Sequence, residues 1–199
     1  FMRQDKTDEA LDAFNRAVSL RENYVQAWYN LGVLYGRKEE NEKSVGAYET
    51  ALMILPEYAK ARLNLAVRLA RMGQPHKAIE HYRKALESDA TYSSAWYNMA
   101  LAHMELKQYE AAEQAMRKML ALEPDSLSAR LLLAQALSSL DRSAEAVDFL
   151  EEAVDIESNS ASLRLALAKS LREIKEYERA RREVYKGLSL EPEHKELHE

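Results

Sequence analysis

The sequence has 199 residues, of which 47% are hydrophobic and 31% charged, with five glycines, four prolines and no cysteine. Its net charge of −5 disfavours general nucleic-acid binding, because proteins that hold phosphate backbones carry a basic excess. The lack of cysteine excludes a disulfide framework and a thiol nucleophile from this sequence, and its apolar runs are too short to span a bilayer.

Identical or similar residues return at fixed intervals along the chain. The tetrapeptide Ala27–Asn30 recurs at Ala95–Asn98, a shift of 68 residues, and prolines 56, 124 and 192 keep the same interval. Half of this interval, 34 residues, separates the members of a row of small side chains, which are Ala10, Ser44, Ala78, Ala112, Ala146 and Ala180. A period of this length indicates stacked supersecondary units, each unable to bury its apolar face alone.

In chain order, the period predicts a partial repeat over residues 1–24 that supplies one second helix, preceded by the last turn of a first helix at residues 1–4. Five full repeats follow, and residues 195–199 begin a further helix, so that 1–199 forms a single array. We number the full repeats 1 to 5; they cover residues 25–58, 59–92, 93–126, 127–160 and 161–194.

Each full repeat predicts two helices. In repeat 1, Trp28, Leu31 and Tyr35 fall at the i, i+3 and i+7 spacing of one helical face. Between the helices of repeat 2, Gly73 and Pro75 supply a helix end and a helix start. No stretch shows the alternation of a strand, so we predict an all-α fold.

The stretch Trp28–Tyr35 reads W-x2-L-G-x2-Y, and Ala78–Ala85 reads A-x3-Y-x2-A. Both resemble the tetratricopeptide repeat (TPR), and the resemblance covers essentially the whole chain. It implies a right-handed superhelix of antiparallel helix pairs. Arg62, Arg130 and Arg164 stand where the family has tryptophan, and we expect these replacements to loosen their repeats.

The family resemblance also implies where a ligand binds, because the first helices of such arrays line a concave groove. We expect the groove to hold an extended or helical segment of a partner protein, and its predicted residues are Tyr29, Asn30, Val33, Arg37, Lys60, Leu63, Asn64, Val67, Arg71, Tyr97, Asn98, Leu101 and Met104. Asn30, Asn64 and Asn98 occupy equivalent positions, and an amide both donates to and accepts from a peptide backbone. Alternatively, these asparagines bond to adjacent helices and hold the array together.

The basic groove residues Arg37, Lys60 and Arg71 favour an acidic or C-terminal group in the ligand. The clamp by which co-chaperone TPR domains hold a C-terminal carboxylate requires Lys at the fifth position of its first repeat and Asn at the ninth. Every full repeat here has Tyr or Leu at the fifth position, and none has Asn at the ninth. Binding to chaperone tails is therefore disfavoured.

No nucleophile with a neighbouring base and no glycine-rich phosphate loop can be read from the sequence. His194 and His198 share the four-residue spacing of a zinc site, but Lys195 stands where a zinc protease needs Glu. We predict a non-enzymatic interaction scaffold without metal or cofactor. Two alternatives stay open: the substrate-presenting region of a larger enzyme, such as an O-linked N-acetylglucosamine transferase-like glycosyltransferase, or a self-assembling structural scaffold.

The two ends of the array are expected to differ from its interior in the exposure of apolar side chains. We expect Leu11, Phe14, Leu188 and Leu197 to expose apolar surface, because each lies in an incomplete or terminal part of the array. We therefore expect the natural protein to continue in both directions and this sequence to associate end to end. The compartment stays open: the cytoplasm is favoured, and the lack of cysteine is also compatible with a bacterial periplasm.

Overall fold

The structure, a computed structural model, describes residues 2–193, with side chains from residue 6 onward. Within this range the chain is all-α, as predicted, with no strand. It divides into two compact parts, residues 1–102 and 103–199, which we call the N-terminal half and the C-terminal half. Each half is described by itself.

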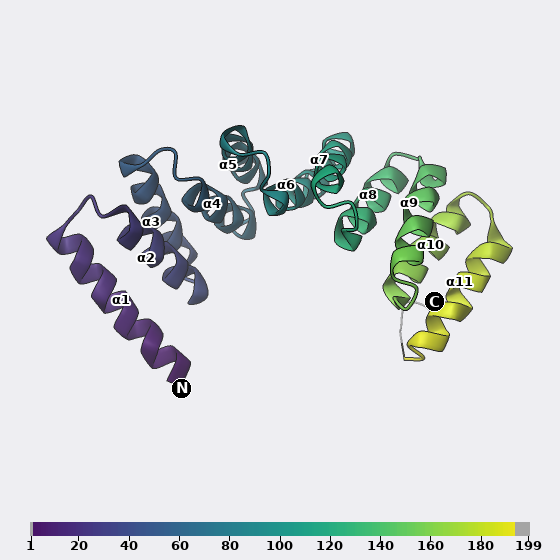
Figure 1. The fold of residues 1–199 in the computed structure, drawn as a ribbon, viewed down its shortest axis with the longest axis horizontal. Helices are drawn as coiled ribbons and strands as arrows, with labels where there is room; N and C mark the ends of the chain where they lie inside the picture. Colours follow the sequence, from purple (N-terminus) through teal and green to yellow (C-terminus); the bar gives the residue numbers. More distant parts are fainter. Residues whose placement is uncertain (1, 194–199) are drawn as a thin grey trace. The chain divides into compact units, whose positions relative to one another are not determined.

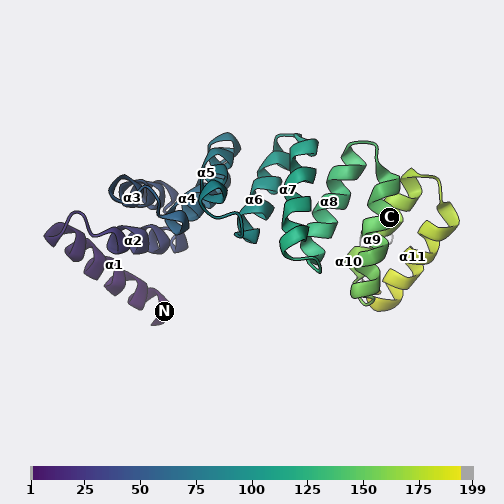
Figure 2. The same cartoon turned by 45° about the horizontal axis from the view of Figure 1, so that its top comes forward.

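Consecutive helices form antiparallel pairs in both halves, as α2 with α3 and α10 with α11 show in Figures 1 and 2. The N-terminal half holds α1 (Met2–Leu20), α2 (Val25–Arg37), α3 (Asn41–Ile54), α4 (Ala59–Arg71), α5 (Pro75–Ser88) and most of α6 (Ser93–Glu105). The C-terminal half holds the end of α6, α7 (Tyr109–Leu122), α8 (Leu127–Ser139), α9 (Ser143–Ile156), α10 (Ala161–Glu173) and α11 (Tyr177–Leu190). The even-numbered helices from α2 to α10 begin at the residues where the 34-residue period places the start of each full repeat.

Helix α1 departs from the prediction of a break after Gln4, because it runs without interruption from Met2 to Leu20. Its first turns contain neither Gly nor Pro, and a continuous helix keeps the backbone amides and carbonyls hydrogen-bonded. The expectation that Leu11 is exposed is also wrong. Leu11 is only 7% exposed and belongs to a core that includes Leu31 of α2.

The other three predicted end residues differ in their surroundings. Phe14 packs half-buried against the same core as Leu11. Leu188 on α11 is half-buried as well, and Leu197 lies outside the described residues. Leu20 at the end of α1 is more exposed than Leu11, Phe14 or Leu188, at 88%.

The close approach of α2 to α3 depends on Gly32. A Cβ atom at this position would lie 2.6 Å from the ring of Tyr48, which is almost fully buried. Ser44 Oγ, also on α3, donates a hydrogen bond of 2.7 Å to the carbonyl oxygen of Gly32. Glycine and a small hydroxyl side chain thus let two helix backbones pack closely around one large ring.

The two helices of each full repeat are joined by a turn whose fifteenth repeat residue has a positive φ. Only repeat 2 uses glycine there, Gly73, with φ 68°. The other four residues are Glu39, Lys107, Asp141 and Lys175. The left-handed conformation costs a non-glycine residue roughly 1–2 kcal/mol, so packing of the flanking helices, rather than local preference, holds these turns.

One hydrogen bond recurs at the fourth residue of every full repeat. In each case a side-chain N–H donates to the backbone carbonyl six residues earlier, at the end of the preceding repeat. The donors are Trp28, Arg62, Trp96, Arg130 and Arg164. The guanidinium therefore keeps the bond that the indole makes, and the looser interfaces expected of these repeats stay a prediction.

Candidate protein-interaction surface

The predicted groove residues of the N-terminal half lie on the first helices of repeats 1 to 3. We call this set the first-helix face; it comprises Tyr29, Asn30, Val33 and Arg37 on α2, Lys60, Leu63, Asn64, Val67 and Arg71 on α4, and Tyr97, Asn98 and Leu101 on α6. Val33, Leu63 and Val67 pack against the core with part of their surface exposed, and Leu101 is 41% exposed. The first-helix face therefore offers apolar surface together with amides and cations.

Tyr29 is held in place by three neighbours. Its ring centroid lies 5.2 Å from that of Tyr58 and 5.9 Å from that of Tyr48, and its hydroxyl oxygen accepts a hydrogen bond of 3.2 Å from Asn64 Nδ2. Burial, with a smaller contribution from Tyr29, raises the pKa of Tyr48 to about 12, so this phenol stays neutral at physiological pH. The cluster joins α2 to α4 and makes Tyr29 a fixed contact surface.

The three asparagines are equivalent in the repeat but differ in their bonding. Asn64 Nδ2 donates to Tyr29, which is the structural role considered above. Asn98 Nδ2 donates to the carbonyl oxygen of Ser94, one turn earlier in its own helix, at 2.8 Å. Asn30 is half-buried, and its amide has no hydrogen-bond partner within the described part of the chain.

Three exposed cations border the first-helix face. Arg37 and Arg71 end α2 and α4, and Lys60 lies in the first turn of α4. Within residues 6–193 none of the three forms an ion pair. No carboxylate of the described chain therefore competes with a ligand carboxylate for these three cations.

Arg68 is a structural residue that the sequence reasoning missed. Its Nη1 donates to the carbonyl oxygen of Gly36 at 3.0 Å and lies 3.5 Å from Asn41 Oδ1, so it ties α4 to the end of α2. A Cβ at Gly36 would lie 2.8 Å from the guanidinium. The only sequence signal was the small residue Gly36, which directly precedes the last residue of α2.

The last predicted groove residue, Met104, belongs to the C-terminal half and is half-buried near the end of α6. This half is instead rich in ion pairs. Glu113 accepts hydrogen bonds from Arg117 at 2.8 Å and Arg142 at 2.6 Å. Burial raises the pKa of Glu113, but these two guanidinium groups offset that effect and leave the pKa below its usual value.

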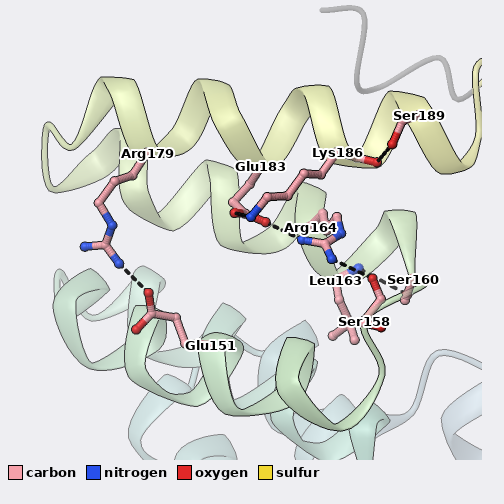
Figure 3. Close-up of polar contacts among 9 residues, drawn as sticks. All are labelled: Glu151, Ser158, Ser160, Leu163, Arg164, Arg179, Glu183, Lys186 and Ser189. Atoms are coloured by element: carbon pink, nitrogen blue, oxygen red, sulfur yellow. Dashed lines mark hydrogen bonds and ion pairs between the residues drawn. The ribbon is translucent and has the colours of Figure 1, made fainter.

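A second network lies among α9, α10 and α11, where Arg164 pairs with Glu183 and Arg179 with Glu151 (Figure 3). Glu151, Arg179 and Glu183 of this network line a hollow of about 140 Å³. Glu151 is exposed, and its ion pair with Arg179 joins α9 to α11. A larger polar hollow of about 520 Å³ lies beside the α8–α9 turn and is lined by Arg142, Ser143 and Glu173 among others.

Residues 2–193 contain neither a membrane-spanning helix nor a cluster of metal-binding side chains. No helix within residues 2–193 combines the length and apolar character needed to cross a bilayer. The same range contains no group of three or more His, Cys, Asp or Glu side chains placed to hold a metal ion.

The antiparallel helix pairs repeat along the chain, and each full repeat has the same side-chain hydrogen bond to the preceding loop. These features define the molecule as an α-helical solenoid repeat protein. Family models described as tetratricopeptide repeat match residues 25–58 and 63–126, and one described as TPR repeat matches residues 1–39. A model described as anaphase-promoting complex, cyclosome, subunit 3 matches residues 115–186. The chain belongs to the tetratricopeptide repeat proteins.

Solved structures show the same fold at low sequence identity. YrrB, described as a TPR protein with an unusual peptide-binding site, aligns over 94% of this chain and 96% of its own at 17% identity, with a TM-score of 0.82. MamA aligns over 84% of this chain and 92% of its own at 20% identity, with a TM-score of 0.80. PilF of Pseudomonas aeruginosa is 27% identical over 93% of this chain and 78% of its own, with a TM-score of 0.68. No curated protein sequence matches significantly.

Proposed function

We propose that the chain is a non-enzymatic scaffold that binds an extended or helical segment of a partner protein on the first-helix face of the N-terminal half. The observation that carries the proposal is the side-chain amide of Asn30, a half-buried residue next to Tyr29 in sequence, which has no partner within the described residues. An amide without an internal partner can both donate to and accept from a ligand. The fold shared with YrrB, described as having a peptide-binding site, supports the same reading.

The chemistry of the first-helix face suits a peptide. The Asn30 amide can donate to a backbone carbonyl and accept from a backbone N–H, each bond contributing roughly 0.5–1.5 kcal/mol net. Val33, Leu63 and Val67 supply apolar surface for alternate side chains, at about 25 cal/mol for each Å² buried. Apolar burial therefore supplies much of the affinity, and the amide fixes the position of the backbone.

The cations at the border of the face favour an acidic segment. Arg37, Lys60 and Arg71 are exposed, and the described chain gives them no carboxylate partner. Exposed charges of this kind act chiefly on the rate of association and on the choice of partner. The ligand is thus expected to combine apolar side chains with at least one carboxylate.

The proposal is tested by selecting binders to the chain from a displayed library of random peptides and measuring their affinity by calorimetry. Asn30→Ala should weaken selected peptides at least fivefold, and the double change Arg37→Glu with Arg71→Glu should weaken the acidic ones further. Asn15→Ala, which removes the same amide from the exposed side of α1, is the matched control and should leave affinity unchanged. Selected peptides that bind the Asn30 and the Arg37/Arg71 variants as tightly as the parent would overturn the proposal.

A further inference from the structure

The arginines at the fourth position of repeats 4 and 5 are each neutralised by a carboxylate of the same repeat. Arg164 on α10 pairs with Glu183 on α11 at 2.6 Å (Figure 3), and Arg130 on α8 pairs with Glu152 on α9. Glu183 is the twenty-third residue of its repeat and Glu152 the twenty-sixth of its own. Where the first helix meets the second, a carboxylate from one of these two positions thus compensates the guanidinium.

Repeat 2 has the arginine but lacks the carboxylate. Its fourth residue is Arg62, its twenty-third is His81 and its twenty-sixth is Lys84. Arg62 donates to the carbonyl oxygen of Pro56, yet it forms no ion pair within the described residues. Repeat 2 therefore has His81 and Lys84 at the two positions from which repeats 5 and 4 supply a glutamate to the arginine.

The imidazole of His81 is also unengaged. Its Nδ1 is buried, and no hydrogen-bond partner is available to it within residues 6–193. Burial lowers the pKa of His81, the charges of Arg62 and Lys84 lower it further, and the neighbouring Glu80 opposes them without reversing the effect. Neither Arg62 nor Lys84 forms an ion pair within the described residues, so Glu80 opposes their charges only in part.

We propose that Arg62, His81 and Lys84 form a binding site, where α4 meets α5, for a carboxylate of an acidic segment of a partner protein. The choice of carboxylate rests on repeats 4 and 5, where the same arginine position accepts a glutamate. The charge of the whole repeat agrees with it, since residues 59–92 hold seven basic and three acidic side chains. The site shares no residue with the first-helix face, and it draws His81 and Lys84 from α5, which contributes nothing to that face.

The sister repeats also supply the test variants. His81→Glu reproduces the Arg164–Glu183 arrangement inside repeat 2, and Lys84→Glu reproduces that of Arg130 with Glu152. Both should fill the site with an internal carboxylate, and His81→Glu should raise the melting temperature by pairing with Arg62. Lys77→Glu is the matched control, because it makes the same charge change as Lys84→Glu at an exposed position of α5.

The probes are tetraglutamate and, in a separate arm, inorganic phosphate, each titrated into the chain while the His81 imidazole is followed by NMR. Tetraglutamate should shift the His81 signals and raise the pKa of His81. His81→Glu and Lys84→Glu should weaken its binding at least tenfold, measured by calorimetry, and Lys77→Glu less than twofold. Equal weakening by Lys77→Glu, or a His81 response to phosphate and not to tetraglutamate, would overturn the proposal. Asn30→Ala should leave tetraglutamate binding unchanged. A negative result for this site is therefore distinguishable from a negative result for peptide binding on the first-helix face.

Discussion

The guanidinium of Arg164 donates to Glu183 at 2.6 Å, and its other terminal nitrogen donates to the carbonyl oxygen of Ser158, also at 2.6 Å. The side chains of Arg164 and Glu183 are only 11% and 12% exposed. Arg164 therefore ties α10 to α11 by an ion pair and to the loop that precedes α10 by a hydrogen bond (Figure 3).

Glu183→Gln should destabilise the protein by about 2 kcal/mol, because it leaves the guanidinium of Arg164 in a buried place with a neutral partner. The variant keeps the shape of the side chain, so the loss reports charge rather than packing. Urea denaturation followed by circular dichroism measures it. A loss below about 0.5 kcal/mol would mean that solvent already screens the pair.

The same pair predicts a pH dependence. Burial raises the pKa of Glu183, but hydrogen bonds from Lys186 and Arg164 lower it by more, so the pKa lies below its usual value. A lowered pKa in the folded state stabilises the fold above the unfolded pKa, about 4.3, and that contribution is lost as the pH falls through the folded value. Between about pH 5 and pH 3 the parent should therefore lose more unfolding free energy than Glu183→Gln. Equal losses would show that Glu183 is not the group that titrates.

We expect the size of the side chain at the fourth residue of a repeat to be coupled to the size of the side chain at the twenty-third. Trp28 packs in one core with Ala47, the twenty-third residue of repeat 1, whereas repeat 2 combines Arg62 with the larger His81. Arg62→Trp alone should lose about 1–3 kcal/mol through overpacking against His81. Arg62→Trp with His81→Ala should recover most of that loss, because it copies repeat 1. A double-mutant cycle by chemical denaturation measures the coupling, and additive changes would contradict it.

The period of 34 residues was enough to predict the fold, because small residues, prolines and apolar stripes repeat with the register of the helices. It did not predict that Arg62, Arg130 and Arg164 keep the hydrogen bond of the tryptophan they replace. A residue type shows what a side chain can donate, but the acceptor is a backbone carbonyl whose position depends on the folded loop.

The candidate site shows the same limit. Asn30, Asn64 and Asn98 look identical in the repeat, yet Asn64 bonds to Tyr29 and Asn98 to its own helix. Their difference arises from side-chain geometry and from which neighbour lies within reach, which a spacing rule does not contain. Leu11 was misjudged for a related reason, since its burial depends on how α1 lies on α2. Whether the first-helix face holds a ligand stays a prediction.

Gly32→Ala should destabilise the protein by about 1–3 kcal/mol, since the new methyl group would meet the buried ring of Tyr48 at 2.6 Å. Gly46→Ala is the matched control: it lies on α3 with nothing within 4 Å of the added Cβ. There the better helix propensity of alanine should stabilise the protein by up to about 1 kcal/mol. Thermal melting compares the two, and equal effects would contradict the close packing of α2 on α3.

Asn64→Ala should lower stability by about 1 kcal/mol, because it removes the hydrogen bond that fixes Tyr29. Asn30→Ala should leave stability nearly unchanged, since that amide has no partner within the described chain. Equilibrium denaturation in urea separates the two variants. If Asn30→Ala were the more damaging change, its amide would have a structural role and would not be free for a ligand.

The most direct test of peptide binding on the first-helix face is an NMR titration of the chain with a selected peptide. The side-chain amide signals of the asparagines report where the peptide binds. Binding on the first-helix face should perturb the Asn30 amide most, that of Asn64 next, and that of Asn15 on α1 not at all. Intermolecular nuclear Overhauser effects should connect the peptide to Val33 and Leu63. Contacts confined to the C-terminal half, with the Asn30 amide unmoved by saturating peptide, would contradict the account.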